Sequence, residues 1–280
     1  MKLLSWSSFL LLPLVAVLIR RRWGSTPNDL SIYDSARWWD HDSSFAILRR
    51  MNLVRVPYFL SHFGKDAKNI IDVGCGGGFV AEDIAKSDIY SVTGFDISEA
   101  SLTIARNHAK SQSLPITYRK GSIYAIPLPD ASVDVVIVSD VLEHLDDIPA
   151  ALREIFRVLK PSGVFVFDTI ARTAWSYLST YLVAQELTGI VEPGAHDWGM
   201  FINPEELERS LKNAGFTTDR SRWAGIGANL SVVNAIKKNS MHDIIESFFR
   251  DDSDFSASYM GFAVKPLWLV YISHTSSVSI

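Results

Sequence analysis

A glycine-rich turn follows an apolar run in the segment IIDVGCGGGF, residues 70–79. Glycines between a strand and a helix leave backbone N–H groups open to a ligand, and the first turn of the helix adds a positive dipole end. Asp96 ends the next apolar run, and its carboxylate can accept hydrogen bonds from both hydroxyls of a ribose. The turn and the acid together predict a site for a nucleotide-like ligand.

The residue at position 79 separates the two enzyme classes that use such a turn. The dinucleotide pattern G-x-G-x-x-G begins at Gly74 and Gly76 but places Phe79 where the third glycine belongs. A bulky side chain there obstructs the close packing of helix on strand, so a pyrophosphate site is disfavoured. The segment DVGCGGG instead resembles the first motif of class I methyltransferases, which use S-adenosylmethionine (SAM) as cofactor. An NAD-dependent oxidoreductase is the competing hypothesis.

Three longer segments are more specific than the glycine turn: ARWWDHDSSFAILRRMNLVR (36–55), EHLDD (143–147) and GAHDWGMFINPEEL (194–207). Together they resemble the UbiG type of O-methyltransferase, which methylates ring hydroxyls of polyprenylated catechols in ubiquinone biosynthesis. The resemblance spans residues 32–216, with a weaker match at YMGFAVK (259–265). It implies a SAM-dependent O-methyltransferase that acts on a prenylated phenol. The alternatives are a methyltransferase for another hydrophobic phenol, thiol or lipid, and a catalytically silent scaffold at a membrane.

The resemblance also assigns cofactor contacts to individual residues. Those of the family fall on Arg55, Gly74, Asp96 and Ser139, with Gly76 in the same turn. Ser139 ends a predicted strand, which places it beside the ligand crevice of an open α/β sheet.

A possible metal site is implied in the same way. The magnesium-associated acid, acid and histidine of the family fall on Asp140, Glu143 and His144. Their spacing of i, i+3 and i+4 would let one helical face present all three side chains. Two carboxylates suit Mg²⁺, but histidine is a less usual ligand for it. The alternative interpretation is that both acids cap the following helix and His144 alone faces the substrate.

Methyl transfer to a phenol needs a base, because a hydroxyl with a pKa of about 10 is a poor nucleophile at neutral pH. Histidine, with an ordinary pKa of about 6.5, can take the proton during the transfer. His144 is the first candidate base and His196 the second, although His196 could equally be a turn residue bonded to Asp197. A cation on the phenol oxygen would lower the pKa of the phenol further.

A parallel sheet would bring these residues together, and the chain between Ile32 and Gly215 alternates β-branched apolar runs with helical patterns. The alternation predicts a Rossmann-like α/β fold with helices on both faces, and the resemblance implies a seven-stranded class I methyltransferase sheet. Strands are predicted at 69–74, 91–96, 116–122, 132–140 and 164–170, with a late strand within 256–266. Helices are predicted at 79–87, 98–112, 148–163 and 204–214, while 217–249 is ambiguous and 231–255 reads as longer and more helical than the family's pattern.

The first 23 residues differ from the rest of the chain. Residues 3–19 carry no charge and are followed by three arginines at 20–22. Because basic residues tend to stay on the cytoplasmic side, we expect a hydrophobic helix that forms an uncleaved membrane anchor. The catalytic domain would then be cytoplasmic or face the matrix at the mitochondrial inner membrane. A cleaved targeting sequence and an interfacial helix are the alternatives. The predicted organisation is an anchor at 1–23, a linker at 24–31, the methyltransferase domain at 32–266 and a tail at 267–280.

A second segment also suggests a membrane surface. Trp175, Tyr177, Leu178, Tyr181 and Leu182 could form one face of an amphipathic helix that meets a bilayer holding the substrate. Core packing is the alternative. The expected partners are therefore a prenylated phenolic substrate, a membrane surface and other enzymes of quinone biosynthesis.

Composition excludes two further classes of function. A net charge of −4 over 280 residues, without a basic stripe, argues against a nucleic-acid partner. The single cysteine, Cys75, cannot form an internal disulfide or a multi-cysteine metal site, and we expect it only to pack.

Overall fold

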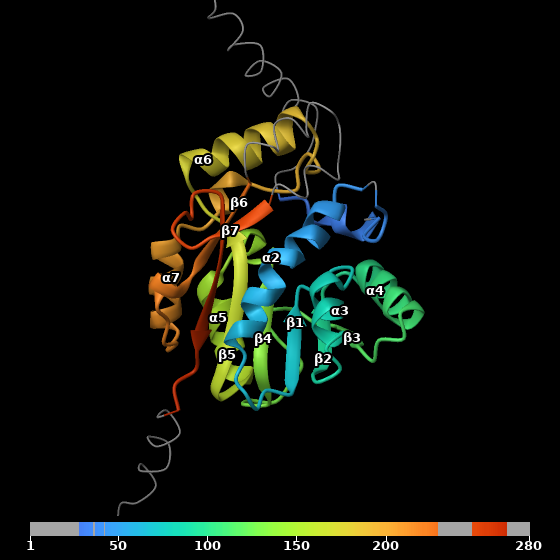
Figure 1. Ribbon diagram of the computed structural model, residues 1–280, viewed down its shortest axis with the longest axis vertical. Helices are drawn as coiled ribbons and strands as arrows, with labels where there is room; N and C mark the ends of the chain where they lie inside the picture. The colour runs from blue at the N-terminus through green and yellow to red at the C-terminus, as the bar shows by residue number, and fades with distance from the viewer. Residues whose placement is uncertain (1–27, 36, 42, 229–247, 268–280) are drawn as a thin grey trace, which may run out of the picture.

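An eight-stranded sheet forms the centre of the computed structural model, which describes residues 28–35, 37–41, 43–228 and 248–267 (Figure 1). The strand order is β3-β2-β1-β4-β5-β8-β6-β7. Strands β1 to β5 pair in parallel, whereas β8 is antiparallel to β5 and β6, and β7 is antiparallel to β6. The strands are β1 Asn69–Val73, β2 Ser91–Asp96, β3 Thr117–Lys120, β4 Val133–Ser139, β5 Leu159–Ile170, β6 Ala224–Ala228, β7 Phe248–Asp251 and β8 Ser258–Val264.

Helices cover both faces of this sheet. The crossovers through α3 and α5 lead away from the β1–β4 pair in opposite directions, and right-handed connections therefore place these two helices on opposite faces. Helix α2 packs beside α3, and α7 packs beside α5. The α-helices are α2 Ala46–His62, α3 Phe79–Ala85, α4 Glu99–Ser111, α5 Ile148–Val158, α6 Ala174–Ser176 and α7 Pro204–Asn213. Short 3-10 helices are η1 Leu30–Ser35, η2 Leu142–His144, η4 Trp198–Met200 and η5 Arg220–Arg222, and η3 Tyr177–Leu187 is a π-helix.

Local sequence explains where these elements form and stop. Residues 135–138 of β4 are completely buried, as expected for a parallel strand covered on both faces. Ser98 is the N-cap of helix α4, and its hydroxyl oxygen accepts the backbone N–H of Ser101. Helix α7 has Asn203 as its N-cap and ends before Gly215, which has a φ of 97°.

The predicted α/β class and the order of its first five strands are confirmed, with two differences. The sheet has eight strands instead of seven, because β7 pairs with β6 at the edge, and β7 lies within the 231–255 segment that the sequence suggested was helical. The helix predicted at 148–163 ends at Val158, and its last part belongs to β5. Pro161 explains this difference, since proline cannot donate within a helix and the residue before it avoids helical geometry.

Among the residues that the structure describes, no helix combines the length and the apolar character that a membrane span requires. The anchor predicted at 1–23 and most of the tail, residues 268–280, lie outside the described residues.

The aromatic segment with a possible membrane-facing side forms α6 and the π-helix η3. Trp175, Tyr177 and Leu178 are exposed, whereas Tyr181 is buried and packs with Ile170 and Phe201. The predicted apolar face is therefore divided between the surface and the core.

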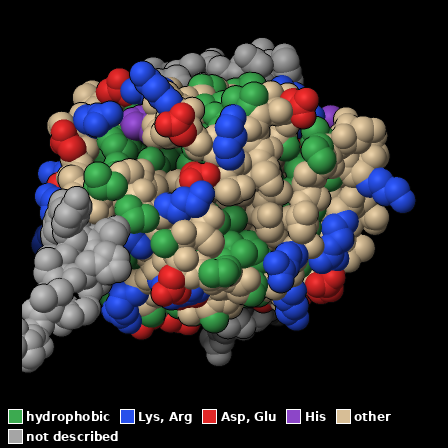
Figure 2. All heavy atoms as spheres, turned by 90° about the horizontal axis from the view of Figure 1, so that it is seen from below, with side chains coloured by type: hydrophobic (Ala, Val, Ile, Leu, Met, Phe, Trp, Pro, Cys, Tyr) green, Lys and Arg blue, Asp and Glu red, His purple; other side chains and the backbone are tan. Residues whose placement is uncertain are grey.

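Charge is not segregated on the face of the molecule shown in Figure 2, where basic and acidic side chains are interspersed with hydrophobic ones. Several surface charges form local pairs, such as Lys86 with Asp83 at 2.6 Å and Lys212 with Glu208 at 2.7 Å. Exposed pairs of this kind contribute about 0–1 kcal/mol each, so they add little to the stability of the fold.

Candidate active site

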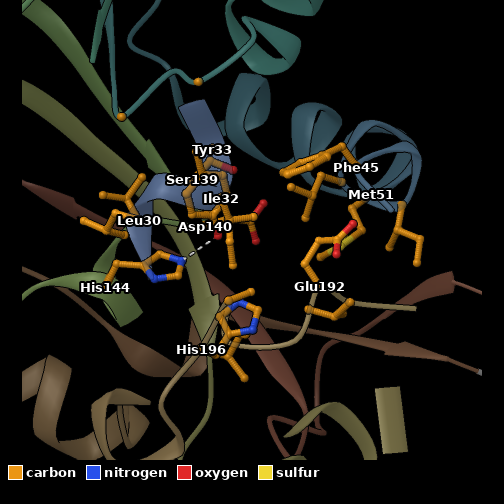
Figure 3. Close-up of a pocket in the computed structure, with 18 of the residues that line it drawn as sticks. Leu30, Ile32, Tyr33, Phe45, Met51, Ser139, Asp140, His144, Glu192 and His196 are labelled. Carbon is orange, nitrogen blue, oxygen red and sulfur yellow. Dashed lines mark hydrogen bonds between the residues drawn. The ribbon is translucent and has the colours of Figure 1, made fainter. Parts of the chain in front are cut away.

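A cavity of about 710 Å³ opens where the parallel strands β1, β2 and β4 end. Ligands of open α/β sheets bind at this edge. Figure 3 shows its labelled side chains pointing inward, with His144 and His196 entering from different segments. Of the residues predicted from the sequence, the following line it: Arg55, Gly74, Gly76, Asp96, Ser139, Asp140, His144 and His196. The remaining predicted residue, Glu143, is completely buried behind this wall.

Asp96 is held in place by the glycine turn itself. Its Oδ2 accepts the N–H of Gly76 at 2.8 Å, and its Oδ1 accepts the N–H of Ser98 at 2.8 Å. Burial raises the pKa of Asp96, whereas these N–H groups oppose that shift. The carboxylate therefore has a fixed orientation in the cavity wall, and its remaining lone pairs can accept ribose hydroxyls.

The glycines of the turn make room for a protein side chain as well as for a ligand. A Cβ atom at Gly76 would lie 2.5 Å from the ring of Trp38, and one at Gly74 would overlap Val141. Trp38 is buried and donates from Nε1 to the hydroxyl of Ser101 at 3.2 Å. The segment before α2 is thereby fixed over the turn, which is a role of this tryptophan that the sequence did not reveal.

Arg55 is buried on α2, and each of its guanidinium nitrogens has a protein partner. Its Nε donates to Oδ1 of Asn52 at 2.7 Å, and its Nη2 donates to the carbonyl of Leu48 at 3.0 Å. Its Nη1 donates to Asp140 and, at 3.1 Å, to Asp168. Burial lowers the pKa of Arg55, but these two carboxylates outweigh it and raise the pKa above the ordinary value. Arg55 thus orients two acids at the cavity wall.

Ser139 lines the cavity, and the buried Asp168 lies directly behind it. Ser139 ends β4 and donates from its hydroxyl to Oδ1 of Asp168. Burial, together with the charge of Asp140, raises the pKa of Asp168, while Arg55 opposes the shift. Asp168 was not predicted as a site residue, although it stands near the end of an apolar strand, as Asp96 does.

His144 lies in η2, and both of its ring nitrogens have partners. Nδ1 is 2.6 Å from Oδ1 of Asn28, and Nε2 is 3.2 Å from the hydroxyl of Tyr33. Burial lowers the pKa of His144 to about 4, although Asp140 opposes the shift. The ring is therefore neutral at pH 7 and can accept a hydrogen bond from a hydroxyl group.

His196 lies beside His144, with the ring centroids 5.2 Å apart. Its backbone N–H and its Nδ1 both face Oε1 of Gln185, at 3.0 Å and 3.1 Å. Burial and, to a smaller extent, His144 lower the pKa of His196 to about 3. The carboxylate of Asp197, which the sequence offered as a partner, instead accepts the N–H of Gly199 at 2.8 Å.

Glu143 has one unsatisfied carboxylate oxygen. Its Oε2 accepts the hydroxyl of Thr169 at 2.7 Å, whereas its Oε1 has no hydrogen-bond partner in the described part of the chain. Burial raises the pKa of Glu143, and Asp140 adds to the shift. Ligand atoms of Glu143, His144 and His196 lie within 4.8 Å of one another. A bare carboxylate oxygen beside two imidazoles fits a divalent cation.

The metal ligands that the sequence suggested do not share one helical face. Asp140 has a φ of 52°, and the 3-10 helix that contains Glu143 and His144 begins after it. His196 completes the cluster, while Asp140 is paired with the buried arginine of α2. Neither predicted acid caps the following helix, because the side chain of Asp147 does so.

Three side chains around the histidines were not predicted from the sequence. Asn28 and Tyr33 are 116 and 111 residues from His144, and Gln185 is 11 residues from His196. No motif or period links positions so far apart, and only the folded chain reveals them.

Comparison with known proteins gives two kinds of match. A family described as "Methyltransferase domain" matches residues 71–167. The ubiquinone biosynthesis O-methyltransferase of Paramagnetospirillum magneticum is 31% identical over 240 residues, which cover 81% of this chain and 89% of the relative. The protein of the same name from Methylobacterium nodulans is 34% identical, over 65% of this chain and 78% of the relative.

Solved structures agree in fold. A SAM-dependent methyltransferase from Aquifex aeolicus aligns with a TM-score of 0.54 at 18% identity, covering 80% of this chain and 98% of its own. The geranyl diphosphate C-methyltransferase of Streptomyces coelicolor, solved with Mg²⁺, geranyl diphosphate and S-adenosylhomocysteine, aligns with a TM-score of 0.56 at 15% identity, covering 86% and 90%. At these identities the likeness extends to the fold alone.

Proposed function

Because the chain belongs to the family of ubiquinone biosynthesis O-methyltransferases, we propose that it transfers the methyl group of SAM to a ring hydroxyl of a polyprenylated catechol. Membership of this family decides between the two cofactor classes in favour of SAM, so the NAD-dependent alternative is set aside. The chain is a SAM-dependent methyltransferase, and its substrate and catalytic groups are the subject of the proposal.

One contact in the cavity supports the proposal of a phenolic substrate. The hydroxyl of Tyr33, itself a phenol, lies 3.2 Å from Nε2 of the neutral His144. A catechol hydroxyl that replaces Tyr33 at this position would donate to the same nitrogen, inside the cavity that Gly74 and Asp96 also line. Apolar side chains at Ile47 and Met51 line the cavity as well and suit a hydrophobic ring and tail.

The cofactor would bind at the glycine turn. Asp96 accepts the ribose hydroxyls, while Gly74 and Gly76 allow the backbone to approach the methionine part. Ser139 and Arg55 both donate hydrogen bonds to Asp168. Their side chains would lie between the cofactor and the substrate.

In the reaction, the phenol oxygen forms a bond to the methyl carbon while the S–CH₃ bond breaks and its electron pair returns to sulfur. The phenolic proton passes to Nε2 of His144. Before methyl transfer this step is unfavourable, since a pKa of about 4 for His144 and about 10 for a phenol differ by about 6 units, or about 8 kcal/mol. The proton therefore moves as the C–O bond forms, and Asp140 stabilises the imidazolium.

The cation cluster offers a second way to activate the phenol. Glu143, His144 and His196 would hold a divalent cation, which would lower the pKa of a bound phenol. Nε2 of His144 has one lone pair, so as a metal ligand it could not also accept the phenolic proton. Two imidazoles and one carboxylate suit a transition metal such as Zn²⁺ or Mn²⁺ better than Mg²⁺.

A membrane-held substrate agrees with the surface beside the cavity. Trp175 both lines the cavity and is exposed, and Leu178 is exposed on the neighbouring π-helix. A prenyl chain could leave the cavity along this side and remain in a bilayer. The proposed anchor at residues 1–23 would keep the domain at the same surface, with the cytoplasm or the mitochondrial matrix as its compartment.

The test is product analysis with methyl-labelled SAM and a series of catechols with and without a prenyl chain. We expect a labelled methyl ether from the prenylated catechols, and its loss in the Asp96→Ala variant. A protein that binds S-adenosylhomocysteine but labels none of these catechols would contradict the proposed substrate, while labelled thiol or lipid would favour the neighbouring alternative.

A further inference from the structure

Two side-chain amides hold the two histidines of the cavity. Asn28 contacts His144 and precedes η1, and Gln185 contacts His196 and lies on the π-helix η3. Asn28 makes two contacts with its histidine, one of them to the backbone, and Gln185 makes three, two of them to the backbone. Those backbone contacts decide which end of each amide is oxygen.

The orientation of Asn28 follows from its second contact. One amide atom faces the backbone carbonyl of His144 at 3.4 Å, and that atom must be the NH₂ group because a carbonyl only accepts. The other atom is therefore the oxygen, and it lies 2.6 Å from Nδ1. An oxygen cannot donate, so Nδ1 of His144 must carry the hydrogen. A flipped amide would face oxygen with oxygen.

The orientation of Gln185 follows in the same way. The atom that faces the backbone N–H of His196 at 3.0 Å must be the oxygen, because a backbone N–H only donates. The same oxygen lies 3.1 Å from Nδ1, while the NH₂ group donates to the carbonyl of His196 at 3.2 Å. Nδ1 of His196 therefore also carries the hydrogen.

From these contacts we propose that Asn28 and Gln185 are positioning residues that select the Nδ1–H tautomer of His144 and His196. In this tautomer each Nε2 keeps its lone pair, on two rings that line the cavity and that form one cluster of potential ligands with the buried Glu143. The opposite tautomer would present N–H groups there and could neither accept a phenolic proton nor bind a cation.

Two segments outside the sheet would orient the histidines. The residues before η1 lie in the range predicted as a linker, yet they supply the partner of His144. The π-helix supplies the partner of His196, and π-helices are rare elements that often occur at functional sites. Both segments must therefore be in place before the cavity has two acceptors.

The test uses the full-length protein, freed of metal and labelled with ¹⁵N at histidine. Long-range ¹H–¹⁵N spectra distinguish the Nδ1–H tautomer from the Nε2–H tautomer directly. In the wild type we expect both cavity histidines as Nδ1–H. Asn28→Ala should give a mixture at His144 and leave His196 unchanged, and Gln185→Ala should do the reverse, so each variant is the control of the other.

Activity provides a second readout. We expect Asn28→Ala to lower kcat by about 10- to 100-fold, as loss of the partner of a functional histidine commonly does, with the KM for SAM unchanged. Asn28→Asp should restore the Nδ1–H tautomer and part of kcat, because a carboxylate oxygen can only accept from Nδ1. The rescue should be incomplete, since the second carboxylate oxygen then faces the backbone carbonyl of His144.

Two results would overturn the inference: Nδ1–H retained at His144 in Asn28→Ala, or Asn28→Asp as inactive as Asn28→Ala. The inference builds on the proposed function, but the two fail differently. The tautomers are read without substrate, so correct tautomers in a protein that methylates no prenylated catechol would reject the substrate and keep the positioning role.

Discussion

Replacing Glu143 with glutamine should make the metal-free protein more stable while lowering its activity. Glu143 is completely buried, one of its oxygens is unsatisfied, and burial raises its pKa. In Glu143→Gln the amide oxygen can accept from Thr169, and the NH₂ group carries no charge and can donate to a histidine lone pair that is free in the same cluster. Removing one unsatisfied buried acceptor is worth about 1–3 kcal/mol. For a domain of this size that corresponds to a rise in Tm of about 2–12 °C.

The gain in stability from Glu143→Gln should depend on pH. A carboxyl group whose pKa is raised by folding disfavours the native state once it ionises, so wild-type stability is highest below the unfolded pKa of about 4.3 and falls as the pH rises toward the native pKa. The advantage of Glu143→Gln should therefore be smallest near pH 4 and grow toward pH 8. Thermal unfolding across this range, in the presence of a chelator, measures it.

Glu154→Gln is the matched control. Glu154 accepts hydrogen bonds from Arg157 and from the N–H of Ile126, and Arg157 lowers its pKa. Its replacement should therefore lower Tm at neutral pH and have little effect under acid conditions, the opposite sign to Glu143→Gln. A Tm of Glu143→Gln equal to or below that of the wild type at pH 8, or an advantage that shrinks with rising pH, would refute the reasoning.

Two further predictions concern the cavity and a third concerns the exposed side of the π-helix. Asp96→Asn should weaken the binding of S-adenosylhomocysteine at least about 10-fold by calorimetry, since one of two charged acceptors for the turn and the ribose is lost; unchanged affinity would place the ribose elsewhere. His144→Ala should lower kcat by about 100-fold or more, as expected on loss of a general base, and retained kcat would remove His144 from the mechanism. Leu178→Ser combined with Leu187→Ser, two exposed positions of the π-helix, should reduce sedimentation with anionic lipid vesicles and leave methylation of a short-chain catechol intact. The exposed Leu53 on α2 is the control position, and equal vesicle binding by all variants would contradict a membrane-facing π-helix.

The parallel half of the sheet could be predicted because each strand is a β-branched run buried on both faces, and because glycine or an acid ends it. Gly74 and Asp96 were found in this way, and they line one cavity. The helix predicted at 148–163 runs past the true start of β5 at Leu159, because a single sequence does not reveal how far a strand extends. The edge strand β7 was missed since its position depends on pairing with β6.

Only some of the residues around His144 and His196 could be predicted from the sequence. Spacing suggested a helical face for Asp140, Glu143 and His144, but the positive φ of Asp140 breaks that face. The contact between His144 and His196 is made by tertiary packing, as is that with Asn28. Periodicity describes neighbours along one element, and these contacts join separate segments.

The measurement that tests the central claim most directly is the mass of the lipid quinone intermediates in cells that lack this protein. The proposed function predicts accumulation of a prenylated catechol that lacks one O-methyl group. The wild-type chain should clear this intermediate, whereas the His144→Ala variant should not. An unchanged quinone profile, or accumulation of an intermediate already methylated at that oxygen, would contradict it.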